Sequence, residues 1–291
     1  MKKVFSNMMD GFKLGHRLFD KGGNLVASST PLTIRGKVRV TGADGSVVNT
    51  HNCTVYNGRR FILESLLRQE PVDTQMLTLN KILDINKDVT VTAAQKLERA
   101  ICLVGVGTGG AGTTFGSKID STMNDNNLFN IIPLRTVRSP LTGDDAEKYF
   151  MRKYENVGGE PFYNYYLMKV STDGIVTKHE NTAYEPSIED NDAVHDTNNP
   201  LSLYNIQVMT TIPIEISENA IKDYFRATDG NINMARFNEL ALYFGIPVTI
   251  TAGDNSYTDY VLVEAFSHLT FNNRAMDTEG SRYDFTYYLI A

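Results

Sequence analysis

The sequence predicts a mainly β protein, an antiparallel β-sandwich with one or two short helices and long loop insertions. In several segments apolar residues recur at every second position, most clearly over Leu203–Ile216. Asp-Gly pairs stand between such segments and favour tight hairpin turns. The 291 residues are 42% hydrophobic and 21% charged, which is long and apolar enough to bury a full core.

The first half begins with a candidate arm. Residues 1–30 mix glycines with isolated apolar residues, which predicts an arm that packs against another surface. From Leu32 the apolar residues alternate, and the turn Ala43–Ser46 separates this strand from a second one within Val47–Tyr56. We therefore expect a hairpin at this point.

A short amphipathic helix is expected next. Asn57 is its predicted N-cap, and apolar residues recur at helical spacing over Gly58–Arg68, so that the helix can lie on a sheet. Residues 70–100 permit a strand over Leu77–Ile85, followed by a helix that opens at the capping box Thr92–Gln95 and runs to Ala100.

Loop chemistry follows the next strand. The apolar run Ile101–Val106 predicts a buried strand, and it leads into the glycine-rich segment Gly107–Ser117. The polar segment Asp120–Asn127 comes next. Both segments are typical of connecting loops.

The second half is more regular. Phe162–Val170 and Ile175–Lys178 flank Asp173-Gly174, which predicts a second hairpin. Pro213 places the end of the strand Leu203–Ile216 at an edge or a bulge, because proline cannot donate to a sheet ladder. Three further strands are expected, and the last two carry apolar residues at period two: Phe237–Phe244, Val261–Phe271 and Tyr283–Ile290.

We expect an N-terminal arm, residues 1–30, and one sandwich domain, residues 31–291, with an inserted loop region at about 107–200. A seam within 107–160 or in the acidic stretch 185–199 would divide the chain into two domains, and insertions into one sandwich fit equally well.

Composition excludes several classes of protein. Lys and Arg number 28 against 34 Asp and Glu, a formal charge of −6, and no long basic run occurs. The chain therefore lacks the footprint of a protein that binds the phosphate backbone of nucleic acids. No stretch approaches 18 apolar residues, and polar residues interrupt the start of the chain. We expect neither membrane insertion nor a signal peptide.

Two nucleotide or metal motifs are incomplete. Gly105–Gly110 matches G-x-G-x-x-G, but no amphipathic helix follows to direct its N–H groups at a pyrophosphate. Asp84–Asp88 starts like a calcium loop, yet Val89 stands where the sharp turn needs glycine. We therefore read the first segment as a connecting loop and exclude an EF-hand at the second.

No catalytic, cofactor-binding or metal-ligating residue is predicted, and no cofactor. Cys53 and Cys102 are interpreted as buried thiols. Spacing does not exclude a Ser-His-Asp triad, whose members come from distant parts of a chain. The acidic run near residue 190 could gather around calcium, but such runs usually form solvated loops. The histidines, His16, His51, His179, His195 and His268, lack metal-ligand spacing. The acidic run consists of Glu189, Asp190, Asp192 and Asp196.

The 15 Tyr and 14 Phe residues concentrate in the strand-rich half, as in Phe162–Tyr166. Packing in the sandwich core, with tyrosine at its rim, is the expected role for most of them. Exposed tyrosines could also form a sugar-binding platform or a subunit interface.

Several segments together resemble a loosely defined group of tailed-bacteriophage virion proteins. In that group a short helix precedes a strand that ends in a "VGTG"-like glycine loop, and the late strands are rich in aromatic residues. The long middle section, 136–200, departs from the pattern. The segments that carry the resemblance are Asn57–Leu67, Ile101–Gly110, Pro133–Arg135, Phe237–Phe244 and Val263–Phe271.

The resemblance implies a non-enzymatic structural subunit of a virion, in the neck or collar or in the tail and baseplate region. Its expected partners are further copies of itself and neighbouring virion proteins, and the particle assembles in the host cytoplasm. A carbohydrate-binding or receptor-binding fibre component is the alternative, and a cryptic particle-associated hydrolase is the second alternative. We expect residues 1–30 to become ordered only in the assembly.

Overall fold

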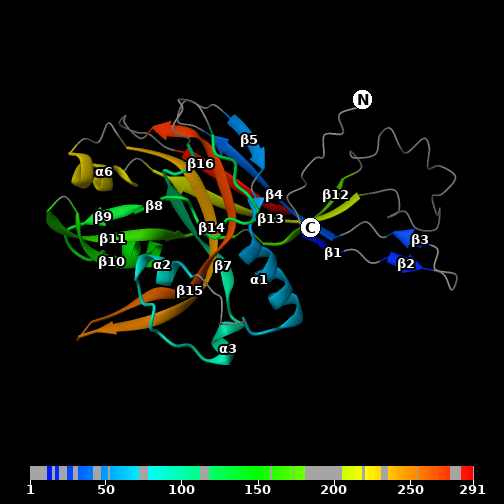
Figure 1. Ribbon diagram of the computed structural model, residues 1–291, viewed down its shortest axis with the longest axis horizontal. Coiled ribbons are helices and arrows are strands. Elements are labelled where there is room, and N and C mark those ends of the chain that lie inside the picture. Colours follow the sequence, from blue (N-terminus) through cyan, green and yellow to red (C-terminus); the bar gives the residue numbers. More distant parts are fainter. Residues whose placement is uncertain are drawn as a thin grey trace.

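The computed structural model places the chain in two large antiparallel sheets with short helices around them (Figure 1). It describes the backbone alone at 12–14, 17–19, 25–28, 32–41 and 47–51, and at some strand ends further on. The remaining described residues are 53–71, 78–111, 118–157, 159–172, 174–180, 205–217, 220–230, 235–253, 255–275 and 283–290.

The first sheet has six strands, with β5 added beside β4. The hairpin expected after Leu32 is confirmed, because β4 pairs antiparallel with β5. In spatial order the strands are β1 (Phe12–Leu14), β4 (Leu32–Thr41), β16 (Tyr283–Ile290), β13 (Asn205–Ile216) and β12 (Val176–Glu180), with β5 (Val47–His51).

The second sheet has eight strands and contains the longest ones. Two short strands, β8 (Ile131–Ile132) and β9 (Arg135–Val137), add to β7 and β11. The main order is β10 (Tyr149–Val157), β11 (Glu160–Lys169), β7 (Ala100–Gly107), β14 (Arg236–Ala252), β15 (Asn255–Ala275) and β6 (Cys53–Thr54). A separate pair joins β2 (Arg17–Phe19) to β3 (Leu25–Ser28).

The mainly β, antiparallel sandwich is confirmed by the pairing and the core. Every described strand pair is antiparallel. Leu240 and Leu242 of β14 share one core with Ile212 of β13 and Phe285 of β16, which joins the two sheets. Tyr243 of β14 belongs to a second core on the opposite side of the eight-stranded sheet. This sheet is therefore buried on both faces.

Short helices cover the edges of the sandwich. The expected amphipathic helix is α1 (Tyr56–Leu67), and Phe61 on it stacks on Phe244 with ring centroids 4.4 Å apart. Its N-cap is Val55, so the prediction that Asn57 caps it was wrong. Asn57 is instead buried in the first turn. The remaining described helices are α2 (Leu79–Leu83), α3 (Ala93–Lys96), α4 (Asp144–Lys148) and α6 (Lys222–Asp229).

Residues 70–100 follow the prediction in part. The capping box is present, with Thr92 accepting from the Gln95 amide, but α3 ends at Lys96 and Ala100 already begins β7. The alternative of a strand over Leu77–Ile85 was wrong, because Thr78 caps α2 there. The Thr78 hydroxyl accepts a bond from the amide of Lys81, a local interaction that favours a helix start over a strand.

The hairpin expected at Asp173-Gly174 does not form. β11 pairs with β10, β7 and β9 in the eight-stranded sheet, whereas β12 pairs with β13 in the other sheet. The connection therefore crosses between sheets. The hairpin partner of β11 is β10, and β10 lies in the region 107–160 that we expected to be rich in loops.

A bulge changes which residues share a face of β15. Leu242 pairs with Ser267 while Tyr243 pairs with Ala265, so that Phe266 is an extra residue. One extra residue in a strand shifts the alternation by one position. As a result Val263 and Ala265 lie in one core and Leu269 lies in the other, although all three are at period two.

Pro213 lies where the sequence places it. β12 pairs with β13 only between Asn205 and Met209, so beyond Met209 one edge of β13 has no described strand beside it. The predicted arm, residues 1–30, lies outside the described side chains. Its division from the domain 31–291 stays a prediction. No helix in the described part of the chain has both the length and the apolar character needed to cross a membrane.

Candidate functional site

The carboxylate of Glu239 is the centre of a buried polar cluster on β14. Its side chain is fully buried. It accepts hydrogen bonds from the backbone amides of Gly109, Phe129 (2.6 Å) and Asn130 (3.2 Å). The neighbouring Asn238 accepts from the amide of Gly110 at 2.7 Å. Two adjacent side chains of one strand therefore hold both the glycine loop and the segment before β8.

The loop needs glycine at these positions because other groups of the protein lie very close to its backbone. A Cβ on Gly109 would lie 2.6 Å from Cβ of Phe129 and 2.7 Å from the Glu239 carboxylate. A Cβ on Gly110 would lie 2.5 Å from the carbonyl oxygen of Asn238. The amides of both glycines already donate to side chains of this protein, and β7 runs antiparallel to its neighbours rather than within a βαβ unit. The reading of Gly105–Gly110 as a connecting loop holds only from Thr108 onward, because Gly105–Gly107 are the last residues of β7.

His268 of β15 completes the cluster. Its Nδ1 lies 2.8 Å from Asp125 and its Nε2 lies 3.0 Å from Glu239, and the ring is fully buried. The ring of Phe129 meets the imidazole edge-on, with centroids 4.8 Å apart. Both ring nitrogens face carboxylates and the ring has no contact with solvent. His268 therefore links β15 to β14 and to the segment around Asp125, and it is not accessible as a base.

A second buried charge cluster lies beneath α1. Arg60 and Arg99 face the carboxylates of Glu64 and Glu264, with an Arg99–Glu64 distance of 2.7 Å and an Arg99–Glu264 distance of 3.9 Å. Arg60 also pairs with both glutamates. Burial raises the pKa of Glu264 to about 7, because desolvation of the carboxylate outweighs the attraction of the two arginines.

Among the remaining candidates from the sequence, Cys53 and Cys102 have described side chains. Cys53 is buried and Cys102 is half-buried, and burial raises the pKa of the Cys102 thiol to about 11. A protonated thiol is a poor nucleophile at neutral pH. Within the described side chains no group of three or more His, Cys, Asp or Glu could hold a metal ion. The side chains of His16, His51, His179 and His195 and the acidic run at Glu189–Asp196 lie outside the described residues.

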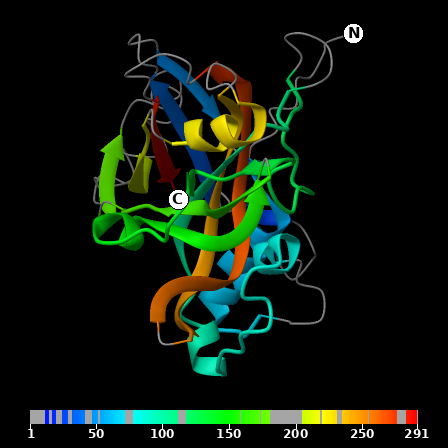
Figure 2. The same cartoon turned by 90° about the vertical axis from the view of Figure 1, so that its left-hand side faces the viewer.

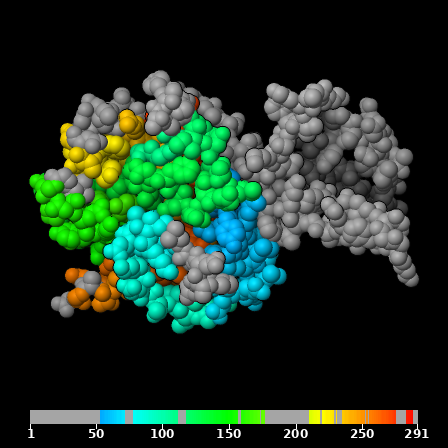
Figure 3. All heavy atoms as spheres, in the orientation of Figure 1, coloured from blue at the N-terminus to red at the C-terminus, as the bar shows by residue number. Residues whose placement is uncertain are grey.

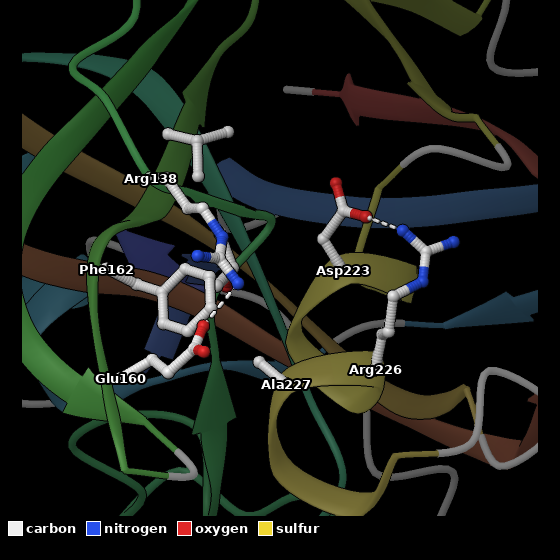
Figure 4. Close-up of a pocket in the computed structure, with 8 residues that line it drawn as sticks. Arg138, Glu160, Phe162, Asp223, Arg226 and Ala227 are labelled. Carbon is white, nitrogen blue, oxygen red and sulfur yellow. Dashed lines mark hydrogen bonds and ion pairs between the residues drawn. The ribbon is translucent and has the colours of Figure 1, made fainter.

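An open pocket of about 490 Å³ lies between α6 and the strands β9 and β11 (Figure 4). On one wall Arg138 pairs with Glu160, and its guanidinium lies 5.5 Å from the centre of the Phe162 ring. On the other wall Arg226 pairs with Asp223 at 2.8 Å. The pocket thus offers one aromatic ring and two ion pairs that are accessible to solvent.

Residues 49–287 match the sequence model of the family described as "Family of unknown function (DUF7208)". The chain belongs to the DUF7208 family. Neither the curated proteins nor the solved structures contain a match to it.

Both buried clusters of this DUF7208 protein lie within the matched residues, and they join segments that are far apart in the sequence. Glu239 and His268 meet the glycine loop, while Glu264 meets Arg60 of α1. Gly58 also lies against β15, because a Cβ there would overlap the carbonyl oxygen of Phe266. Four of the five segments that carry the phage resemblance therefore contact one another in two polar clusters.

The sequence singles out these segments, but no local pattern predicts a role for their polar residues. A signal was present in the strands themselves. Glu239, Glu264 and His268 interrupt apolar runs that predict buried strands, and a buried charge needs a partner. Sequence spacing alone does not identify that partner, since Asp125 and His268 are 143 residues apart.

Proposed function

We propose that this DUF7208 protein is a structural subunit of a tailed-phage virion, which assembles as a homo-oligomer in the neck or collar or in the tail and baseplate region. Its partners are further copies of the chain and neighbouring virion proteins. Its role is to form part of the architecture of the particle, and it needs no cofactor. The proposal extends the resemblance stated above.

One observation supports this proposal most directly. Among the side chains that the structure describes, Glu239, His268 and Asp125 have the most capable chemistry, and they are almost or fully buried and bonded to one another and to backbone amides. A catalytic group must reach a substrate atom at hydrogen-bond distance. These side chains instead fasten loops to strands, which suits a protein whose product is an assembly.

The native mass of the purified protein, measured by light scattering at tens of micromolar, tests this proposal. A discrete ring-sized oligomer supports a neck or collar position, since a head-to-tail contact that closes gives a fixed number of copies. A trimer favours a fibre or its adapter instead. A stable monomer contradicts the homo-oligomeric part of the proposal.

The pocket of Figure 4 favours a second candidate, a carbohydrate-binding or receptor-binding fibre component. Phe162 supplies an apolar ring, and the charged groups of Glu160 and Asp223 can exchange their arginine partners for sugar hydroxyls. A glycan array separates the candidates. Specific binding that is lost in Phe162→Ala favours the fibre component, and an empty array favours the structural subunit.

A further inference from the structure

The two longest strands of the larger sheet, β14 and β15, extend past their neighbours as a two-stranded ribbon. β7 pairs with β14 only as far as Gly245, and β6 pairs with β15 only at Ser267 and His268. From Pro247 to Asp259 the two strands pair only with each other among the described residues. Figures 1 and 2 show this ribbon in orange below β10 and β11, and in Figure 3 its orange atoms lie at the lower left, beneath the green atoms.

A strip of aromatic and cationic side chains connects the ribbon to the sheet. The guanidinium carbon of Arg152 on β10 lies 3.6 Å from the centre of the Tyr257 ring on β15 and 5.7 Å from that of Tyr163 on β11. Tyr163 in turn meets Tyr154, its direct partner across the two strands, with ring centroids 4.9 Å apart. We call Tyr154, Tyr163, Arg152 and Tyr257 the tyrosine strip.

Solvent reaches the tyrosine strip. Tyr154 is 63% exposed, and its other three side chains are partly exposed. At its base the ribbon is bonded to β10, because the carboxylate of Asp259 accepts hydrogen bonds from the amides of Met151 (2.7 Å) and Arg152 (3.3 Å). The strip is therefore held in one arrangement before a ligand arrives, which lowers the entropy cost of binding.

Arg152 gives the tyrosine strip a positive charge. In the part of the chain that the structure describes, no carboxylate forms an ion pair with its guanidinium. The carboxylate of Asp259 instead accepts hydrogen bonds from the amides of Met151, Arg152 and Tyr260 and from the side chain of Asn86. A guanidinium in this situation can bind the carboxylate of a ligand through two parallel hydrogen bonds.

The chemistry of the tyrosine strip favours a sugar chain over other ligands. A tyrosine ring offers an apolar face for the C–H groups of a sugar and a hydroxyl for its polar groups. The rings of Tyr154 and Tyr163 are inclined by 48°, so that a flat aromatic ligand cannot stack on both, whereas consecutive rings of a saccharide can turn to match them. A nucleic acid would need several cations to neutralise its phosphates, and the strip has one.

We propose that the tyrosine strip binds an acidic polysaccharide, with sugar rings on Tyr154 and Tyr163 and a sugar carboxylate at Arg152. This site differs from the pocket of Figure 4, which is lined by Phe162 and two ion pairs. It is also independent of the homo-oligomer of the proposed function, because all four side chains come from one chain.

Surface plasmon resonance on immobilised polysaccharides tests the site. The acidic probes are alginate, polygalacturonate and polysialate, and the neutral control is dextran. Non-specific attraction to the acidic probes is not expected, since the chain itself has a formal charge of −6. We expect binding to at least one acidic probe and none to dextran, and this binding should weaken about tenfold or more in Tyr154→Ala and in Arg152→Gln.

Two control variants distinguish the tyrosine strip from other surfaces. Tyr56→Ala removes a tyrosine that is 60% exposed on α1, and it should bind as the wild type does. Phe162→Ala should also leave binding unchanged. If Arg152→Gln fails to fold, Tyr154→Ala still decides the question, because most of the Tyr154 side chain lies in solvent.

Three results would overturn the proposal. They are no binding to any acidic probe, equal binding to dextran, and binding that is lost in Phe162→Ala but kept in Tyr154→Ala. Light scattering on the same samples reports the oligomeric state separately. A protein that forms a discrete oligomer but binds no polysaccharide therefore refutes the tyrosine strip and leaves the proposed function standing.

Discussion

Glu239 shows how a single buried carboxylate can organise a loop. It accepts hydrogen bonds from three backbone amides and faces one nitrogen of His268. Removal of the carboxylate therefore leaves several donors without an acceptor. Each buried donor left without an acceptor costs about 1–3 kcal/mol, because it has also lost its hydrogen bonds to water. The loss is therefore much larger than for an ion pair in solvent.

Glu239→Ala should lower the free energy of unfolding by about 3–5 kcal/mol in urea titrations. Glu160→Ala is the matched control, because Glu160 pairs with Arg138 at the surface. It should cost less than about 1 kcal/mol. Similar losses in the two variants would show that the buried cluster contributes little to stability.

Glu264 should make stability depend on pH with a defined sign. The folded chain holds the proton of this carboxyl up to about pH 7, because burial raises its pKa from the ordinary 4.5. Between these two values folding takes up a proton, so that the free energy of unfolding falls as pH rises.

The comparison with Glu264→Gln isolates this effect. From pH 4.5 to 7 the wild type should lose about 3 kcal/mol relative to the variant, and the difference should level off above pH 7. Urea unfolding at a series of pH values measures it. A difference that stays constant, or that changes in favour of the wild type, contradicts the raised pKa.

At the scale of elements, a glycine allows α1 to pack closely against the larger sheet. Gly58 lies so close to β15 that a Cβ would overlap the backbone of Phe266. In an ordinary helix, replacing glycine with alanine gains up to about 1 kcal/mol. Here the helix would have to move away from the sheet, which would disturb the stacking of Phe61 on Phe244.

Gly58→Ala should therefore destabilise the protein by about 1–3 kcal/mol. Gly174→Ala is the control, since a Cβ there meets nothing within 4 Å. Thermal unfolding followed by circular dichroism measures both. A more stable Gly58→Ala variant would show that α1 is not in close contact with β15.

Local elements were predictable and long-range pairing was not. The capping box at Thr92 and the hairpin after Leu32 depend on interactions within a few residues, and both are confirmed. The misplaced hairpin at Asp173-Gly174 has correct turn chemistry, but β12 pairs with β13 instead of β11. Which sheet a strand joins depends on packing that no local pattern records.

The candidate site was predictable only as separate pieces. The glycine loop follows its strand as the sequence predicts, yet its partner Glu239 lies 130 residues away from Gly109. Periodicity also does not predict that the strand changes faces at Phe266. Val263, Ala265 and Leu269 keep a regular spacing of two in the sequence whether or not a bulge lies between them.

At the scale of the whole molecule, residues 1–30 are the part of the chain most open to removal. The family match begins at residue 49, and within residues 1–30 only β1 pairs with a strand of a large sheet, β4, among the described residues. The two cores described above consist of residues between Val55 and Tyr287. Removal of β1 uncovers the edge of β4 at Leu32–Ile34.

Deletion of residues 1–30 should change the free energy of unfolding by about 1 kcal/mol or less but weaken self-assembly. Thermal unfolding and light scattering on the same sample give the two readings. Normal assembly of the shortened chain would show that the N-terminal arm is not needed for it.

The pairing of β7 with β14 also determines when the protein can fold. Gly107 pairs with Glu239, so the middle of the larger sheet joins residues separated by more than a hundred others. Such distant contacts slow folding, since a long loop must close before they form. On the ribosome β7 emerges well before this partner, and the edge that pairs with β14 stays open until β14 has been synthesised. Its apolar residues are then open to aggregation, so that a slower rate of translation between the two strands would reduce the yield of folded protein.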